Sequence, residues 1–388
     1  MKRIPILLIS FFLLISLTNC STCSSNHNYD RDYKYQQKKS GAETHKSFDV
    51  NSGGLLDVHV ETGGSIRVTG WNKNVVDVKV YLSGRDKNNV DVKIKNHGNN
   101  VSVETEFIEE NWNNKLNCRV VVKVPLKYNI DFTTMGGSVY FKDIQGEFTG
   151  KTMGGELELE NLKGIVDMST MGGSISTINS DLDGDLSTMG GSVDFDNLVG
   201  NVNAKTMGGS IHHDVKRRAD GSGSKSKVNI ETMGGDIDVT DAFYGAKVKT
   251  MGGSIRIKKA EKFVQATTMG GNIRIGEVDG WVKAKTMGGD IKCTVVGSND
   301  GKKDIQLTSM GGDIELYVPD NFSADIDIEI RYDKREEGDF EIVSDFNINT
   351  EIERKNRKRT LIGTGKSGSG KHKITIRTVG GSVYLKKK

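Results

Sequence analysis

Alternation of apolar and polar residues runs through most of this chain and predicts β-strands rather than helices. Leu56–Val60, Val76–Val80 and Val101–Val103 each place an aliphatic side chain at every second position, which is the pattern of a strand with one buried face. No long segment shows the i, i+3, i+4 apolar spacing of an amphipathic helix. The chain is therefore predicted to be all-β.

In the central part of the chain the alternation repeats with a nearly fixed period. The tetrapeptide Thr-Met-Gly-Gly, or a one-residue variant of it, occurs ten times, and seven of the nine intervals between its methionines are 18 residues. The other two intervals are 26 and 23 residues. Such a period indicates that similar structural units stack on one another. The methionines are Met135, Met153, Met171, Met189, Met207, Met233, Met251, Met269, Met287 and Met310.

Each unit contains two short strands whose apolar positions are out of phase. Four residues after every methionine stands an aliphatic residue, and six residues after it the residue is mostly apolar, with Thr177, His213 and Cys293 as variants. Before the methionine, the apolar residues stand five and three positions away, as do Val166 and Met168. This change of parity predicts a corner near Thr-Met-Gly-Gly, where glycine is suited to a tight bend.

No unit can bury its inner face alone, so the units must stack. Residues 131–318 are therefore predicted to form a regular β-solenoid of about 18-residue coils, with like residues in columns about 4.8 Å apart.

The methionine column has two interpretations. If the corner lies between Thr and Met, both side chains point inward and Met fills the corner of the core, as a flexible apolar side chain can. We expect this arrangement. If the corner lies at Gly-Gly instead, the methionines form an exposed apolar stripe, which would be a contact surface.

The first residues predict export. Two basic residues among the first three precede an apolar run from Ile4 to Leu17, which is typical of a secretory signal and too short to span a bilayer as a helix. Residues 1–19 are thus a predicted signal peptide. Cys20 follows directly and resembles the lipidated cysteine of bacterial lipoproteins, so a membrane anchor is expected. A plain cleaved signal peptide is the alternative.

The rest of the chain divides by composition. Residues 20–45 are the lipidated cysteine and a polar, flexible tether. Residues 46–130 are an N-terminal β region of hairpin-like strands, and they carry an early echo of the repeat at Glu61–Val68. Residues 319–388 are decayed repeats and a C-terminal cap, in which the last repeat-like unit, Ile374–Leu385, is expected to end the array.

Composition and net charge limit the classes of partner that the chain is expected to bind. Glycine is abundant (47) and proline scarce (3), which suits short strands and tight turns. Removal of residues 1–19 leaves 52 basic against 51 acidic residues, a net charge of +1. A nearly neutral chain of mixed charges does not indicate nucleic acid as a partner.

The two long intervals carry extra residues at the same register of the unit, so both insertions are expected to protrude from one edge of the solenoid. Both are basic and rich in Gly and Ser, and they are candidate loops for binding a polyanion through charge. Merely solvated loops are the alternative. The candidate residues are Lys216, Arg217, Arg218, Lys225, Lys227, Lys302 and Lys303.

Motifs that would carry chemistry are not found. Asp181–Asp185 resembles the start of a calcium loop but lacks the Gly and Glu that an EF-hand needs later in the loop. Cys118 and Cys293 fall on inward positions, and a buried thiol is the simplest interpretation of each. The sequence therefore predicts no catalytic residue, no metal site and no cofactor.

At this point the chain resembles the bacterial β-strand-repeat proteins of unknown function that are described as adhesins. The resemblance rests on Gly64–Trp71, on Val124–Leu126 before the first repeat, and on Gly368–Lys371 followed by Ile374–Leu385. It covers roughly residues 46–388. It implies a β-solenoid on an exported protein and supplies no catalytic residues.

These observations favour a lipid-anchored β-solenoid of the cell envelope or outer membrane, on its surface or periplasmic face. Its expected activity is binding without catalysis, with an anionic glycan or a host or matrix surface as the partner. A polymerising structural protein of the envelope is one alternative, because solenoid ends expose unpaired strand edges. An enzyme acting on envelope polysaccharide is the other.

Overall fold

The computed structural model describes residues 42–109, 115–215, 227–336 and 338–388. The described residues belong to one compact unit, Gly41–Lys388. Residues 1–40, which include the predicted signal peptide and Cys20, lie outside the described residues. In the described ranges the elements are strands, apart from two 3-10 turns at Lys87–Asn89 and Lys334–Glu336. None of the described segments is a helix long and apolar enough to cross a membrane. The all-β prediction is confirmed.

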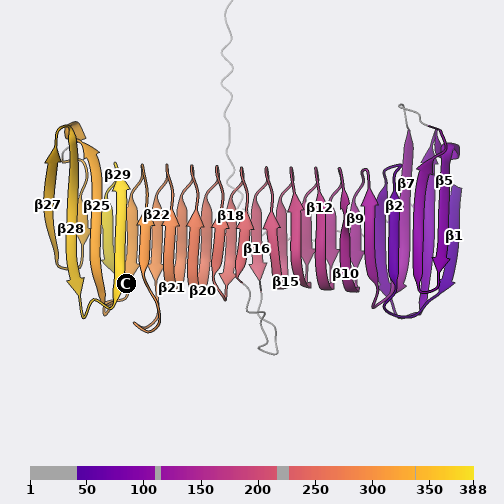
Figure 1. Cartoon of the computed structure of the whole chain (residues 1–388), viewed down its shortest axis with the longest axis horizontal. Helices are drawn as coiled ribbons and strands as arrows, with labels where there is room; N and C mark the ends of the chain where they lie inside the picture. Colours follow the sequence, from indigo (N-terminus) through magenta and orange to yellow (C-terminus); the bar gives the residue numbers. More distant parts are fainter. Residues whose placement is uncertain (1–41, 110–114, 216–226, 337) are drawn as a thin grey trace, which may run out of the picture. The chain divides into compact units, whose positions relative to one another are not determined.

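The units of the array stack as parallel coils, each with one strand on either of two walls (Figure 1). On one wall Gln145 pairs with Lys163 and Thr152 with Thr170, a shift of one coil. On the other wall Leu157 pairs with Ile175. The strands are β8 (Asn129–Thr134), β9 (Val139–Lys142), β10 (Gln145–Thr152), β11 (Leu157–Glu160), β12 (Lys163–Thr170), β13 (Ile175–Ile178), β14 (Asp181–Thr188), β15 (Val193–Lys205), β16 (Ile211–Val215), β17 (Val228–Glu231), β18 (Ile237–Ala242), β19 (Ala246–Lys249), β20 (Ile255–Thr267), β21 (Ile273–Lys285), β22 (Ile291–Val295), β23 (Ile305–Thr308) and β24 (Ile314–Val318).

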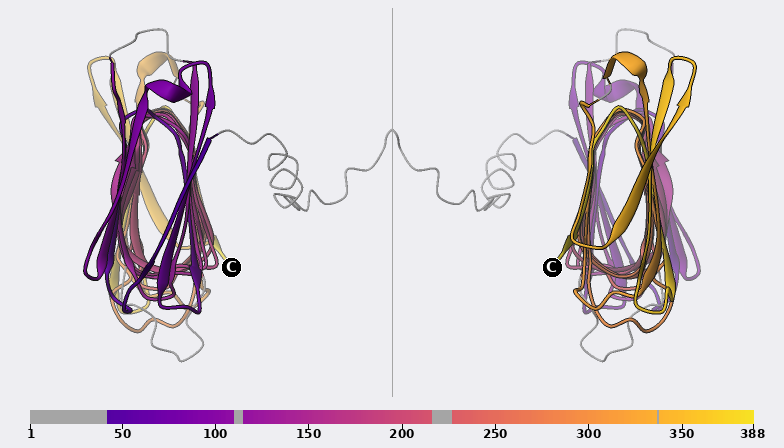
Figure 2. Two further views of the ribbon diagram at one scale, coloured as in Figure 1. Left: turned by 90° about the vertical axis from the view of Figure 1, so that its right-hand side faces the viewer. Right: turned by 90° about the vertical axis from the view of Figure 1, so that its left-hand side faces the viewer.

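The core lies between the two walls, which face each other when the coils are viewed end-on (Figure 2). The aliphatic residues four positions after each methionine are 0–1 % exposed. The variants Thr177, His213 and Cys293 in the next inward column are buried as well. The predicted β-solenoid and its inward columns are confirmed, because alternation with two parities leaves only one way to bury every apolar side chain.

At the N-terminal end the chain leaves the array and returns to it. The coil formed by β2 (Leu55–Val60) and β3 (Ser65–Trp71) pairs in parallel with β8 and β9 on one side. On its other side it pairs in parallel with β6 (Asn100–Phe107) and β7 (Leu116–Pro125). The echo of the repeat in this region is thus a true coil of the solenoid.

Antiparallel strands close this end. Strand β4 (Val75–Gly84) pairs with β7, β1 (Ala42–Asp49) pairs with β4, and β5 (Val90–His97) pairs with β6. Because β1 begins at Ala42, residues 42–45 are strand, and the tether predicted for residues 20–45 is too long by these four residues.

The C-terminal end uses the same interlocked arrangement. The last two strands, β29 (His372–Val379) and β30 (Val383–Lys387), pair with β23 and β24. Outside them lie β25 (Ala324–Asp333) and β26 (Ile342–Ser344), followed by β28 (Lys358–Ser367) and β27 (Ile348–Lys355). The expectation that Ile374–Leu385 ends the array is wrong, because this unit pairs with strands on both sides and the antiparallel β27–β28 hairpin forms the end.

Candidate functional site

Each Thr-Met-Gly-Gly turn is fastened to the preceding turn by its threonine. The buried hydroxyl of Thr170 donates to the carbonyl oxygen of Gly155 at 2.7 Å and accepts the N–H of Gly173 at 3.3 Å. A buried hydroxyl that both donates and accepts is satisfied, so the threonine column has a structural explanation. The same pair of bonds recurs at Thr188, Thr206, Thr232, Thr250, Thr268 and Thr286.

The second glycine of each turn is fixed by the close approach of neighbouring coils. A Cβ at Gly173 would lie 2.1 Å from the carbonyl oxygen of Gly155, and a Cβ at Gly253 would lie 2.1 Å from that of Gly235. These neighbours are backbone atoms held in the ladder, so they cannot move aside. This column therefore excludes every side chain.

The methionine column faces solvent, so the expectation of a buried column is wrong. The ten side chains are 42–56 % exposed. In the strand before the corner, the inward-facing residues stand five, three and one positions before Met, so the threonine is the last of them. The corner falls at Gly-Gly. Methionine is then an outward residue of the strand before the corner, and core packing does not explain it.

The outer surface of the array carries segregated charge. Residues 129–214 contain thirteen acidic and four basic residues, whereas residues 245–292 contain ten basic and four acidic ones. All ten basic residues of the second range are exposed, and they are Lys247, Lys249, Arg256, Lys258, Lys259, Lys262, Arg274, Lys283, Lys285 and Lys292. The solenoid thus presents an acidic half and a basic half along its axis.

Four of these side chains form a compact group on the wall that contains β19, β20 and β21. Lys247 and Lys283 flank Gln265 in the ladder, and Lys249 and Lys285 flank Thr267. With two coil steps from one pair to the other and two residue steps within each pair, the group spans about 10 by 7 Å. We call Lys247, Lys249, Lys283 and Lys285 the lysine quartet. Lys249 donates to Glu231 at 2.7 Å and lowers the pKa of that carboxyl.

The lysine quartet is not apparent as a run of charge in the linear sequence, because its lysines come together only when the coils stack. The signal was present: residues 247, 265 and 283 are one period apart. The same applies to Phe263 and Trp281, which stack on this wall with ring centroids 4.9 Å apart. The aromatic pair stands two residues before the quartet's column in each coil.

The candidate residues of the two basic loops differ in whether the structure describes them and in how exposed they are. Lys216, Arg217, Arg218 and Lys225 lie outside the described residues, whereas Lys227 is exposed at the start of β17. The Lys302 side chain is 71 % exposed and lies 3.8 Å from Asp304. The expectation that Lys303 binds a polyanion is wrong. Its side chain is 3 % exposed, donates to the carbonyl oxygen of Val296 at 2.7 Å and pairs with Asp279. It stands seven residues before Met310, on the inward parity, so it is not available to a ligand.

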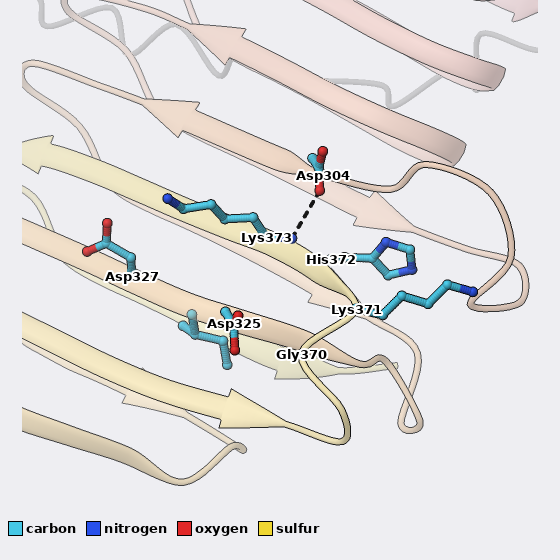
Figure 3. A pocket seen from close by; sticks show the side chains of 8 residues that line it. Asp304, Asp325, Asp327, Gly370, Lys371, His372 and Lys373 are labelled. Atoms are coloured by element: carbon cyan, nitrogen blue, oxygen red, sulfur yellow. Dashed lines mark hydrogen bonds between the residues drawn. The ribbon is translucent and has the colours of Figure 1, made fainter.

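An open hollow of about 390 Å³ lies near the C-terminal end, where β23, β29 and β25 run side by side (Figure 3). Lys373 stands between Asp304 and Asp325 across the three strands. Its backbone N–H donates to Asp304 at 3.1 Å. Opposite charges on neighbouring strands stabilise a sheet, so this acid–base–acid row has a structural role.

The buried titratable groups are held in unreactive forms. Burial raises the pKa of the Cys293 thiol to about 12 and also raises that of Cys118, so neither thiol ionises near neutral pH. Burial lowers the pKa of His213 to about 4 and leaves the imidazole neutral. Within the described ranges, no group of three or more His, Cys, Asp or Glu residues is placed to hold a metal ion.

The comparisons with known proteins define the family. The model of the Toastrack DUF4097 family matches residues 30–386. The chain therefore belongs to this family of β-solenoid-like repeat proteins, whose function is unknown. None of the curated proteins compared with the chain matches it.

Several solved structures are similar at low identity. A putative adhesin from Parabacteroides merdae is 15 % identical, with 66 % of this chain and 97 % of that chain covered and a TM-score of 0.38. A putative cell adhesion protein from Clostridium sporogenes is 11 % identical, with 89 % and 99 % covered and a TM-score of 0.19. A putative lipid binding protein from Parabacteroides distasonis is 10 % identical, with 90 % and 97 % covered and a TM-score of 0.27. These names describe those proteins only.

Proposed function

We propose that this protein is an exported, lipid-anchored scaffold of the cell envelope that binds an anionic glycan through the basic half of its solenoid. The observation that carries the proposal is the segregation of charge: ten exposed basic side chains against four acidic residues over residues 245–292. A field of one sign on a rigid surface attracts an oppositely charged polymer. The anionic glycan accords with this surface because its charges also recur along an extended chain.

The lysine quartet is the proposed centre of the contact. Lys247, Lys283 and Lys285 make no ion pair with a described residue, so their ammonium groups are available to a ligand. The stacked Phe263 and Trp281 beside the quartet offer an apolar surface for a sugar ring. Charge and an adjacent ring surface together suit a charged carbohydrate better than a small anion.

The test is retention of the full chain on an immobilised sulfated glycan such as heparin. Replacing the quartet by Gln should lower the salt concentration needed for elution, because fewer charges contact the polymer. The matched control replaces Lys127, Lys151, Lys163 and Lys205, which are also exposed but lie outside the basic half. Both variants lose the same charge, so equal elution of the two would contradict the proposal.

Two further arms separate the related interpretations. Replacing the loop residues Lys216, Arg217, Arg218, Lys225 and Lys227 by Gln tests whether that insertion takes part. Co-sedimentation with vesicles of anionic phospholipid tests a lipid headgroup as the source of negative charge. Binding to vesicles but not to the glycan would replace the carbohydrate with a membrane surface.

The anchor and its location need a separate experiment in cells. Cys20→Ala should release the protein from the membrane fraction, because the proposed acyl chains would have no attachment site. Protease treatment of intact and lysed cells then distinguishes the two faces. Cleavage in intact cells places the solenoid on the surface, whereas cleavage only after lysis places it in the periplasm and favours a role in envelope maintenance.

A further inference from the structure

The invariance of the methionine column within this chain has no explanation in the fold. Threonine is required by its hydrogen bonds and the second glycine by its backbone contacts. Methionine is about half exposed in all ten turns. In the next coil along the axis Val379 occupies the equivalent position and is 40 % exposed, so the turn accepts another side chain.

Repetition of an ancestral unit does not by itself preserve outward residues. The outward column two positions before each methionine contains Thr133, Lys151, Ser169, Glu231 and Lys285, among others. That column contains four residue types, whereas the methionine column contains one. The difference indicates that methionine is retained for a property of its own side chain.

The ten methionines form one uninterrupted ladder along the edge of the solenoid. The N–H of Gly208 donates to the carbonyl oxygen of Met189 at 3.0 Å, and the N–H of Gly252 donates to that of Met233 at 2.9 Å. Gly234 donates in the same way to Met207 at 3.0 Å, across the 26-residue interval. Neighbouring methionines in the sequence are thus neighbours in space even where an insertion separates them.

The side chains of the column share the same partial exposure. The ten methionines are 42–56 % exposed, whether another methionine lies on one side or on both. The column is therefore a continuous, solvent-accessible stripe of thioether side chains.

This column has the chemistry and the spacing of a soft-metal site. Thioether sulfur is a ligand for soft monovalent ions such as Cu(I). Successive coils are about 4.8 Å apart, and equivalent sulfur atoms have the same spacing when their side chains share a rotamer. A zinc–sulfur bond is about 2.3 Å, and two bonds of similar length in line span about 4.6 Å. The coil spacing therefore matches the distance that one ion needs between two neighbouring thioethers.

We propose that the methionine ladder binds soft monovalent metal ions, Cu(I) or Ag(I), each held between the sulfur atoms of two adjacent coils. The site is independent of the proposed glycan contact, because it uses a different column and an uncharged ligand group. With two thioethers for each ion, a ladder of ten methionines can hold up to five ions at once. A thioether has no proton to lose, so binding persists at pH 5, where a histidine site would weaken.

The experiment compares two variants with the same number of methionines. The alternating variant replaces Met153, Met189, Met233, Met269 and Met310 by Leu, which leaves five methionines and no adjacent pair. The block variant replaces Met135, Met153, Met171, Met189 and Met207 by Leu, which leaves five methionines in four adjacent pairs. Leucine keeps the surface apolar, and an exposed position tolerates it, so both variants should fold.

Ag(I) is titrated into each full-length protein, after accessible thiols have been capped with N-ethylmaleimide, with native mass spectrometry and calorimetry as readouts. We expect the block variant to keep about two ions, at two thioethers for each ion, and the alternating variant to bind at least about tenfold more weakly, because a second ligand on the same scaffold acts at high effective concentration. Oxidation of wild-type methionine to sulfoxide with peroxide should also abolish binding.

Equal binding by the two variants would overturn the proposal, since it would mean that single thioethers suffice. Failure of the wild-type chain to bind Ag(I) would overturn it as well. Retention of a cellular partner by both Leu variants, without metal binding, would assign the stripe to an apolar contact instead. None of these outcomes depends on glycan binding, so the two proposals succeed or fail separately.

Discussion

Both edges of the solenoid connect its two walls, one through a repeated turn and the other through varied connections. At the Thr-Met-Gly-Gly edge one turn is repeated ten times, with a threonine in nine turns, Ser309 in the tenth and a fixed glycine in all ten. At the other edge the corners vary: Asp143 and Asn161 adopt positive φ, β20 and β21 run through as continuous strands, and residues 296–304 form a loop. In Figure 1 that loop leaves the lower edge, while the repeated turns line the upper edge.

The difference between the edges shows which part of a repeat can vary in sequence and length. The repeated edge is constrained by contacts between coils, since each threonine bonds to the previous turn and each second glycine lies against it. The opposite edge is held mainly by the strands that enter and leave it. The insertion that the structure describes, residues 296–304, lies at this opposite edge, as the sequence predicts.

The largest effect should come from filling the contact between two turns. Gly253→Ala places a methyl group 2.1 Å from the carbonyl oxygen of Gly235, and we expect about 3 kcal/mol or more of destabilisation in chemical denaturation. The matched change at the variable edge is Gly301→Ala. Nothing lies within 4 Å of its Cβ, and only its φ of +73° opposes the substitution, so about 1 kcal/mol is expected. Similar losses at both edges would break the comparison.

Acid should loosen the variable edge next. His213 is buried against Phe195, with ring centroids 5.2 Å apart, shortly before the 26-residue unit's insertion. Burial lowers its pKa to about 4, below the roughly 6.5 of the unfolded chain. Stability is therefore fully present above pH 6.5 and falls as the pH drops toward 4, by about 3 kcal/mol at most.

The measurement is hydrogen exchange at pH 7 and pH 4.5. Protection in β16 and β17 should fall more than protection in the repeated turns of β20 and β21. His213→Phe, which copies the phenylalanine found at position 195 of the same column, should remove most of this pH dependence. A pH profile unchanged by His213→Phe would show that other groups control the acid response.

Removing one turn hydroxyl should have a smaller effect. Thr250→Val deletes the bonds to Gly235 and Gly253 while keeping the shape of the side chain, and we expect a loss of about 1–3 kcal/mol because a buried N–H loses its acceptor. Thr267→Val is the control, since this threonine points outward on the same wall. A loss at Thr267 as large as that at Thr250 would refute the fastening role.

The smallest effect is expected from lengthening the variable edge. Four Gly and Ser residues inserted between Asn299 and Asp300 should change stability by about 0.6 kcal/mol or less, because closing a longer loop adds little entropy cost. Thermal denaturation measures the change. The same insertion between Met251 and Gly252 should prevent cooperative unfolding of the full array, and tolerance at both places would remove the distinction between the edges.

Much of this fold was predictable from alternation alone. The solenoid, its inward columns and the edge that carries insertions all follow from the parity of residues around each methionine. Two predictions, the burial of the methionines and the exposure of Lys303, were wrong because they departed from this parity. Met251 and its equivalents are outward residues before the corner, and Lys303 stands at an inward position despite its charge.

The interlocked ends were not predictable in this way. The insertion of β29 between β23 and β25, and of β30 between β24 and β26, depends on pairing between residues far apart in the sequence. Alternation gives strand faces but not strand order. The lysine quartet was predictable in principle, since its two pairs of lysines are two periods apart. It became visible once the coils were placed in register.

The interlocked C-terminal end also sets the order in which the molecule can be completed. The strands β29 and β30 are synthesised after all the strands that they pair with, which are β23, β24 and the cap strands β25 and β26. Until residues 372–387 emerge, the strands of the array and of its cap lack these partners. A chain cut short before His372 would thus be marked as incomplete by exposed strand edges, and cellular proteases would distinguish it from the finished protein.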